Sequence, residues 1–344
     1  MSNSRTFFAS SLALALAATL VASGCRDDDG DVVGGSPPEG GGGSGSGGQP
    51  SNGGGDEGGG PIAGCEGPEA TVEDVATGSF GPGSKVSVNG VVAMSHKFLV
   101  SKSSSTDNCL WGVFVSAPGL EETAENSGLL VLSYGFKAEI PKGGDQSFCP
   151  RLGQDPAGDK IPDNVKPGDV LDVIGTVSRF PDQPECTAPN PPNQVGMLQL
   201  GSVCKADIVG DAPVPTPHVL TAAEAEGISS TTDEGFHDKW GAVKVRVENA
   251  KVEPQDGMVV GEFGVIKLDN GVEVGDKIYY RGYSNNMCHE GPVFTDPNVT
   301  FARVDGFHYL AFCSWGIQAN DKCADFDPKS EDCTAATCEP DFID

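Results

Sequence analysis

The sequence predicts an all-β protein in which two small β-barrels follow one another behind a disordered, glycine-rich tether. Short runs of alternating or β-branched residues recur through residues 65–344, and Gly, Pro, Asn and Asp bound them. Helical periodicity is nearly absent from the same region. Its 280 residues suffice for two domains of ordinary size, with one large all-β domain as the alternative.

The first 24 residues have the composition of a signal peptide. Arg5 precedes an apolar run from Phe7 to Ala22, which two serines and one threonine interrupt. The run is shorter than the roughly twenty residues of a membrane-spanning helix, and no Lys or Arg stop-transfer cluster follows it. We therefore expect residues 1–24 to be removed on export, and a retained transmembrane anchor is the less favoured interpretation.

Residues 21–25 (VASGC) resemble the bacterial lipobox, in which small residues precede a cysteine that is acylated and becomes the new N-terminus. Ala22 stands where Leu is commoner. The resemblance implies that Cys25 is the lipid attachment site and that several acyl chains hold the protein on a membrane. It implies a bacterial outer-membrane or cell-surface location, with a periplasm-facing position as an alternative. An ordinary signal peptide with a chance cysteine is the competing hypothesis.

Residues 25–64 have the composition of a disordered Gly/Ser-rich linker. Gly accounts for 17 of these 40 residues. Such a segment buries too little apolar surface to offset the entropy lost on ordering. As a flexible coil it would span on the order of 35 Å.

A proline-rich segment at 211–217 (DAPVPTP) divides the remaining chain, because proline cannot join a central strand. We expect a first barrel domain over 65–212 and a second over 213–344, which ends in a Cys-rich acidic tail. Residues 168–177 (GDVLDVIGTV) and 302–311 (ARVDGFHYLA) hold the same place in the two halves, which suggests degenerate copies.

The strands are expected where apolar and polar residues alternate. In the first half these ranges are 85–94, 111–115, 129–132 and 170–177, and in the second half 242–252, 263–268, 277–280 and 304–312. A short helix is expected over 220–226, with Thr221 as its N-cap and Gly227 at its end.

The mature chain is strongly acidic. Without the signal peptide it keeps 49 acidic and 21 basic groups, a formal charge of −28. This charge repels nucleic acid and anionic lipid at long range, so a nucleic-acid partner is disfavoured.

The cysteines predict a disulfide framework. Beside Cys25 an even set remains, which is typical of exported proteins, and the close Cys pairs of zinc sites are lacking. The pairing is not deducible from the sequence. The ten candidates are Cys65, Cys109, Cys149, Cys186, Cys204, Cys288, Cys313, Cys323, Cys333 and Cys338.

The stretches "GSKVSVNGVVAM", "WGVFVSAPG" and "VKPGDVLDVIGTVSRF" resemble the OB-fold modules that accompany bacterial extracellular nucleases and recur in surface lipoproteins. The second half, from "KWGAVKVRVENAKV" to "CSWGIQ", looks like the partner module that follows in such chains. The resemblance covers nearly all of residues 70–327. In that family the nuclease activity belongs to a separate domain, for which no residues are left here.

A closed five-stranded barrel is physically reasonable for these stretches. Glycines such as Gly90 and Gly175 permit the coiling that closure requires, and closure hides the sheet edges. The inward positions of the first barrel are expected at Val86, Val88, Val170, Val173 and Val177. The three tryptophans, Trp111, Trp240 and Trp315, are expected mainly in the core.

No catalytic, cofactor-binding or metal-ligating residue stands out. The five histidines, His96, His218, His237, His289 and His308, show no metal-like spacing, and there is no G-x-S-x-G or phosphate-binding loop. The triplet Cys288-His289-Glu290 is interpreted as a disulfide cysteine beside a loop histidine. Two aspartate-rich loops, 155–163 and 321–332, leave structural calcium open as an alternative to solvated acidic loops.

We therefore expect a non-enzymatic envelope lipoprotein that acts as a binding or scaffold module for an extracellular protein or carbohydrate partner. An accessory role in extracellular nucleic-acid processing is the alternative, and a cryptic hydrolase is a third. OB-folds bind ligands with one sheet face and its loops. A barrel face plugged by the long loops at 133–165 and 179–198 would favour a scaffold.

Overall fold

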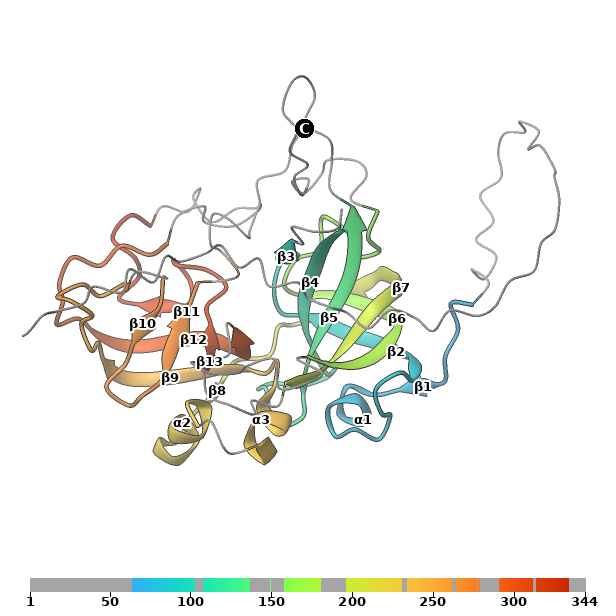
Figure 1. The fold of residues 1–344 in the computed structure, drawn as a ribbon, viewed down its shortest axis with the longest axis horizontal. Helices are drawn as coiled ribbons and strands as arrows, with labels where there is room; N and C mark the ends of the chain where they lie inside the picture. Colours follow the sequence, from blue (N-terminus) through green and yellow to red (C-terminus); the bar gives the residue numbers. More distant parts are fainter. Residues whose placement is uncertain are drawn as a thin grey trace, which may run out of the picture.

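A computed structural model describes residues 64–102, 108–136, 149, 158–180, 196–230, 234–261, 264–276, 278, 291–311 and 314–333. Residues 1–63, which include the expected signal peptide, Cys25 and the expected linker, lie outside these residues. Strands dominate the described chain, and its three helices are of at most seven residues. The all-β prediction is confirmed at this level. Figure 1 shows two β-sheets side by side.

The first sheet has the strand order β1-β2-β6-β7-β5-β4-β3, and β2 also pairs with β4. The pair β5–β7 is parallel, whereas β2–β6, β6–β7, β4–β5 and β2–β4 are antiparallel. Its strands are β1 (Glu69–Ala70), β2 (Lys85–Ala93), β3 (Phe98–Lys102), β4 (Asn108–Ser116), β5 (Gly128–Phe136), β6 (Asp169–Phe180) and β7 (Met197–Asp211).

The second sheet has the order β10-β11-β13-β12-β9-β8, with β14 paired to β12. An antiparallel bridge from Val252 to Leu268 adds a contact between the end of β9 and that of β10. Its strands are β8 (His218–Val219), β9 (Lys244–Lys251), β10 (Ile266–Lys267), β11 (Glu273–Gly275), β12 (Thr300–Ala311), β13 (Ser314–Gln318) and β14 (Phe326–Asp327).

The two sheets repeat one pairing scheme. In chain order, β2, β4, β5, β6 and β7 correspond to β9, β10, β11, β12 and β13. The third and fifth strands are parallel in both sets, and the fourth is antiparallel to the first and the fifth. The two stretches compared in sequence, 168–177 and 302–311, lie in β6 and β12, the fourth strand of each set.

Most expected strands are present, with shifted ends. The ranges 85–94, 111–115, 129–132, 170–177, 242–252 and 304–312 lie in or largely overlap β2, β4, β5, β6, β9 and β12. The range 263–268 shrinks to β10, and most of 277–280 lies outside the described residues. Strands β3, β7 and β13 were not anticipated, nor were the short strands β1, β8, β11 and β14.

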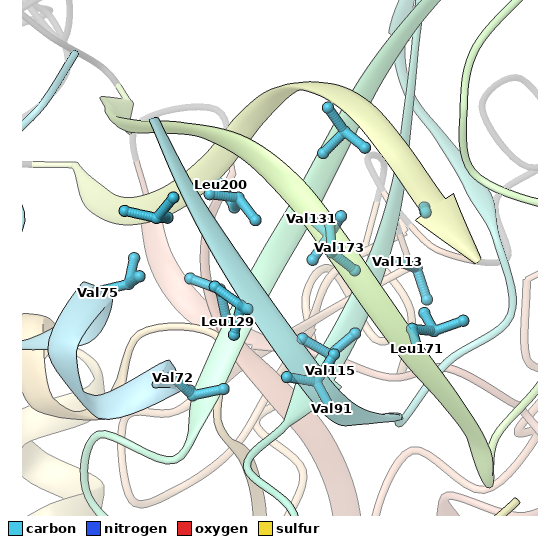
Figure 2. Close-up of a cluster of buried hydrophobic side chains, with 14 of the residues drawn as sticks. Val72, Val75, Val91, Val113, Val115, Leu129, Val131, Leu171, Val173 and Leu200 are labelled. Carbon is cyan, nitrogen blue, oxygen red and sulfur yellow. The ribbon is translucent and has the colours of Figure 1, made fainter. Parts of the chain in front are cut away.

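The core of the first sheet is an aliphatic cluster that β2, β4, β5, β6 and β7 enclose (Figure 2). Val86, Val88, Val173 and Val177 are buried as expected. The inward position expected at Val170 is wrong: Leu171 is buried there, and Val170 is only partly covered. Buried and partly covered residues alternate without a break from Asp169 to Val177, so Val170, an odd number of residues from Val173 and Val177, lies on the opposite face of β6.

Three short helices cover the ends of the sheets. They are α1 (Val72–Ala76), α2 (Ala222–Ile228) and α3 (Glu234–Trp240), and only α2 was expected. Thr221 is the N-cap of α2 and forms a capping box with Glu224. Gly227 does not end the helix. A Cβ there would lie 2.7 Å from the ring of Phe236, so glycine is needed where α2 packs on α3.

Three disulfides lie within the described residues: Cys65–Cys204, Cys109–Cys149 and Cys323–Cys333. The expected disulfide framework is thus present for six of the ten cysteines. Cys186, Cys288, Cys313 and Cys338 lie outside the described residues. Among the described segments, no helix has the length and apolarity needed to cross a membrane.

Candidate functional site

The outer face of β4 and β5 is buried against the second half of the chain. The inward side chains of these strands fill the core of the first sheet, and the outward ones meet β12 and β13. The shared cluster contains Met94, Phe98, Val100, Leu110, Phe114, Leu130, Leu132 and Met197 from the first half, and Ala242, Ile278, Phe307, Tyr309, Leu310, Ala311 and Trp315 from the second. We call this cluster the interface core.

Aromatic stacking forms the centre of the interface core. The rings of Phe114 on β4 and Phe307 on β12 are parallel, with centroids 4.2 Å apart. Phe98 stacks on Phe114 with ring centroids 5.5 Å apart, and the ring of Tyr309 packs edge-to-face against Phe114. Such pairs add stabilisation beyond that of buried area. The contact therefore has the character of a domain interior.

Further hydrogen bonds, a close backbone approach and an ion pair also join the two halves of the chain. The hydroxyl of Thr123 donates to the carbonyl of Lys244, and the amide of Asn126 donates to the carbonyl of Lys239. At Gly128 the chains approach so closely that a Cβ would lie 2.4 Å from the carbonyl oxygen of Ala242. An ion pair joins Arg179 on β6 to Asp238 on α3.

Two histidines that are 71 residues apart form a buried pair beside the interface core. The Nδ1 atom of His237 on α3 lies 2.9 Å from Nε2 of His308 on β12. The outer nitrogens face carbonyl oxygens, Nε2 of His237 facing Ser230 at 2.6 Å and Nδ1 of His308 facing Gly316 at 3.1 Å. The indole of Trp315 stacks on both imidazoles.

These three contacts require three N–H groups. Each carbonyl oxygen accepts a hydrogen bond, so each outer nitrogen must carry a proton. The contact between the two rings needs one proton more. Two neutral imidazoles supply only two, so two neutral rings can form hydrogen bonds at no more than two of the three contacts.

Burial, and secondly the neighbouring His237, lowers the pKa of His308 to about 3. The unfolded chain takes up this proton at about pH 6.5, so His308 stabilises the fold above that pH and the contribution is lost as pH falls toward 3. We expect the unfolding free energy of wild type to fall relative to that of His308→Phe by up to about 1.4 kcal/mol per pH unit below 6.5. Urea unfolding of both proteins at pH 7, 6 and 5 measures this difference. The same change in unfolding free energy with pH for wild type and for His308→Phe would contradict the prediction.

A third histidine lies at the surface of the same region. His218 on β8 contacts Glu122 through Nδ1 at 3.1 Å and Glu224 through Nε2 at 3.4 Å, and its ring stacks on Trp240. The three tryptophans are buried, as expected. Neither the pairing of His237 with His308 nor this cluster carries a local signal in the sequence, because the partners come from distant segments.

Lysine ammonium groups contact the aspartates of both acidic loops. In the loop at 155–163, Asp159 and Asp163 contact Lys97. In the loop at 321–332, Asp332 pairs with Lys322 at 2.6 Å and Asp325 with Lys244 at 2.8 Å. These described carboxylates already have cationic partners, which disfavours the calcium alternative. Asp155 lies outside the described residues.

Asp276, at the end of β11, is a buried carboxyl group that the sequence did not single out. Burial raises its pKa to about 6. The side chain packs directly over Gly264, which has a positive φ of 73° and could not carry a Cβ there. Its neighbours 262, 263 and 277 lie outside the described residues.

Within the described ranges, no group of three or more His, Cys, Asp or Glu side chains is arranged to hold a metal ion. Cys25, the expected lipid attachment site, and the triplet Cys288-His289-Glu290 lie outside those ranges.

Comparison with family models, curated proteins and solved structures finds no match. The resemblance of the two halves to OB-fold modules and of residues 21–25 to a lipobox therefore stays a prediction. What the site can do follows from its own geometry: the outer face of β4 and β5 is already in contact with the second half of the chain.

Proposed function

We propose that this chain is a non-enzymatic envelope lipoprotein whose two OB-type barrels form one rigid binding or scaffold module for an extracellular protein or carbohydrate partner. The burial of the outer β4–β5 face against β12 and β13 carries the proposal. Lipid on Cys25 would anchor the module, and residues 25–64 would act as its tether.

The strand pairings support the OB assignment. In the first half, β2 pairs with β4, β4 with β5, β5 with β7, β7 with β6 and β6 with β2, so the pairings return to their starting strand. The second half repeats this order, with the bridge between Val252 and Leu268 in place of the β2–β4 pairing. A five-stranded Greek-key barrel of this order is the OB architecture.

The buried face favours a scaffold over a single-strand binder. OB-folds bind oligonucleotides and oligosaccharides with the sheet face and loops that β4 and β5 would provide here. Binding of single strands needs exposed aromatic side chains beside basic groups. Here Phe114 and Phe307 stack on each other instead, and the mature chain has a charge of −28. A partner would therefore be recognised by other surfaces, such as the loops.

The accessory role in nucleic-acid processing rests on the family resemblance alone. No contact in the described residues favours this role. The DNA titration below distinguishes it from the scaffold.

The test compares the full chain with Cys25→Ser in the native host. We expect wild type to enter the detergent phase with an acylated N-terminal peptide, and the variant to be released into the aqueous phase. Chemical cross-linking on intact cells should then capture the same envelope protein or glycan repeatedly with wild type and not with the released variant.

The same preparations are titrated with single- and double-stranded DNA at low salt. We expect no retardation in a gel-shift assay. An unmodified N-terminus would contradict the anchor, and tight DNA binding would contradict the scaffold and favour the accessory role.

A further inference from the structure

Lys97, in the turn between β2 and β3, is completely buried, and its amine contacts two aspartates. Its Nζ donates to Asp159 Oδ2 at 2.9 Å and to the carbonyl of Ile161 at 2.9 Å, and it also contacts Oδ1 of Asp163. The ring of Trp111, itself buried, has its centroid 5.0 Å from Nζ. The amine and the carboxyl groups come from segments more than sixty residues apart.

The two carboxyl groups have different surroundings. The side chain of Asp159 is 2 % exposed and that of Asp163 is 29 % exposed. Burial raises the pKa of Asp159, although the nearby Lys97 opposes the shift. The Asp159 carboxyl is therefore the one that most readily becomes neutral, while Asp163 keeps access to water.

We propose that Lys97 and Asp159 join in a spontaneous intramolecular isopeptide bond, with Asp163 as the group that carries the proton. This inference goes beyond the proposed function, because it concerns a covalent modification of the chain itself. The geometry supplies its three requirements: a buried amine, a buried carboxyl group in contact with it and a second acid beside both.

The reaction balances without any co-reactant. Asp163 carries one proton from the Lys97 ammonium to Asp159, which leaves a neutral amine, a neutral Asp159 acid and an ionised Asp163. The nitrogen lone pair then forms a bond to Cγ of Asp159. Asp163 takes a second proton from this nitrogen and gives it to the hydroxyl, which leaves as water when the C–OH bond breaks. An ammonium and a carboxylate thus become one amide and one water.

The pocket favours this reaction in two ways. A charged pair that is removed from water is costly, so exchange of the proton to give neutral amine and acid costs less here than at the surface. The contacts to Ile161 and to the face of Trp111 hold Nζ beside the carboxyl group, which replaces an encounter in solution by a fixed geometry.

A second buried lysine provides an internal control. Lys322 pairs with Asp332 at 2.6 Å, but Asp332 is its one ion-pair partner in the described residues. Hydrogen bonds from Lys322 and Ser330 outweigh the effect of burial and lower the pKa of Asp332. Without a second acid and with a carboxylate that stays ionised, Lys322 should remain a free amine.

The bond would connect the β2–β3 turn covalently to the segment that precedes β6. That connection lies near the disulfide Cys109–Cys149, since Cys149 packs with Trp111 in one buried cluster. Unlike a disulfide, an amide is stable to reduction. The first half of the molecule would keep a covalent cross-link in any redox environment.

Peptide mapping of the full-length protein tests the inference. The protein is purified from the envelope, reduced, alkylated and digested with trypsin, which does not cleave after an acylated lysine. We expect a branched species in which peptide 86–102 is joined to peptide 152–160 with the loss of one water. Fragmentation should locate the bond at Asp159. Cleavage after Lys322 should be normal and should yield the free peptide 304–322.

Two variants test the roles of the side chains. Lys97→Arg retains the charge and cannot form the bond, and circular dichroism shows whether it folds. Asp163→Asn retains the amine and Asp159, and we expect its linking rate to fall by roughly a hundredfold, the contribution of a positioned acid–base group.

Three outcomes would overturn the proposal. Full recovery of free peptide 86–97 from folded wild type would exclude the bond. A bond from Lys97 to peptide 161–179, which contains Asp163, would contradict the assigned electrophile. Linking of Asp163→Asn at the wild-type rate would contradict the proton-carrying role. None of these results bears on the anchoring or binding experiments above.

Discussion

Replacing Cys65 and Cys204 by serine is expected to lower the free energy of unfolding by about 5 kcal/mol. The disulfide joins the first described residues to β7 across a sequence separation of 139. Without it the unfolded chain gains the conformational freedom of that long loop, and the loss grows with loop length. Denaturant unfolding of wild type and the double variant measures the difference.

The short-loop disulfide Cys323–Cys333 is the matched control, because its sequence separation is 10. The corresponding double serine variant should lose about 3 kcal/mol. If the long-loop variant were no less stable than the short-loop variant, the entropic account of the framework would be wrong.

The variant Phe307→Ala is expected to lose about 3–5 kcal/mol and to uncouple the two halves. Phe307 is fully buried and stacks on Phe114 across the interface core. Removal of the Phe307 ring leaves a cavity where the two halves meet, and each half keeps its own hydrophobic core. Calorimetry should change from one cooperative transition to two.

Phe301 on the same strand separates interface loss from simple loss of volume. It is also fully buried, but it packs in the core of the second sheet. Phe301→Ala should lose a similar free energy in the second half without uncoupling the halves. If Phe307→Ala still unfolded in one transition, the interface core would not be what couples them.

The strands of the fold were predictable where local pattern and burial agree. The runs at 85–94 and 170–177 lie in β2 and β6 because their alternating apolar residues face one core. Strand β7 was missed because its N-terminal residues 197–201 are all buried, so they show no alternation. Thr221 and Glu224 fix the start of α2, but Gly227 is explained only by the ring of Phe236.

The candidate site was much less predictable than the fold. His237 and His308 are 71 residues apart, and Lys97 lies 62 residues from Asp159. Their contacts depend on how the chain packs, for which the spacing of residues along the sequence gives no signal. The same holds for the interface core: Phe114 and Phe307 follow the strand pattern, and that pattern does not say which outward faces meet.

Residual dipolar couplings of the folded chain test the rigid coupling of the two halves most directly. If the outer face of β4 and β5 is buried against β12 and β13, couplings from residues 69–211 and 218–327 must fit a single alignment tensor. Two different tensors would mean that the halves reorient independently, which would contradict the buried interface and leave that face open to a ligand.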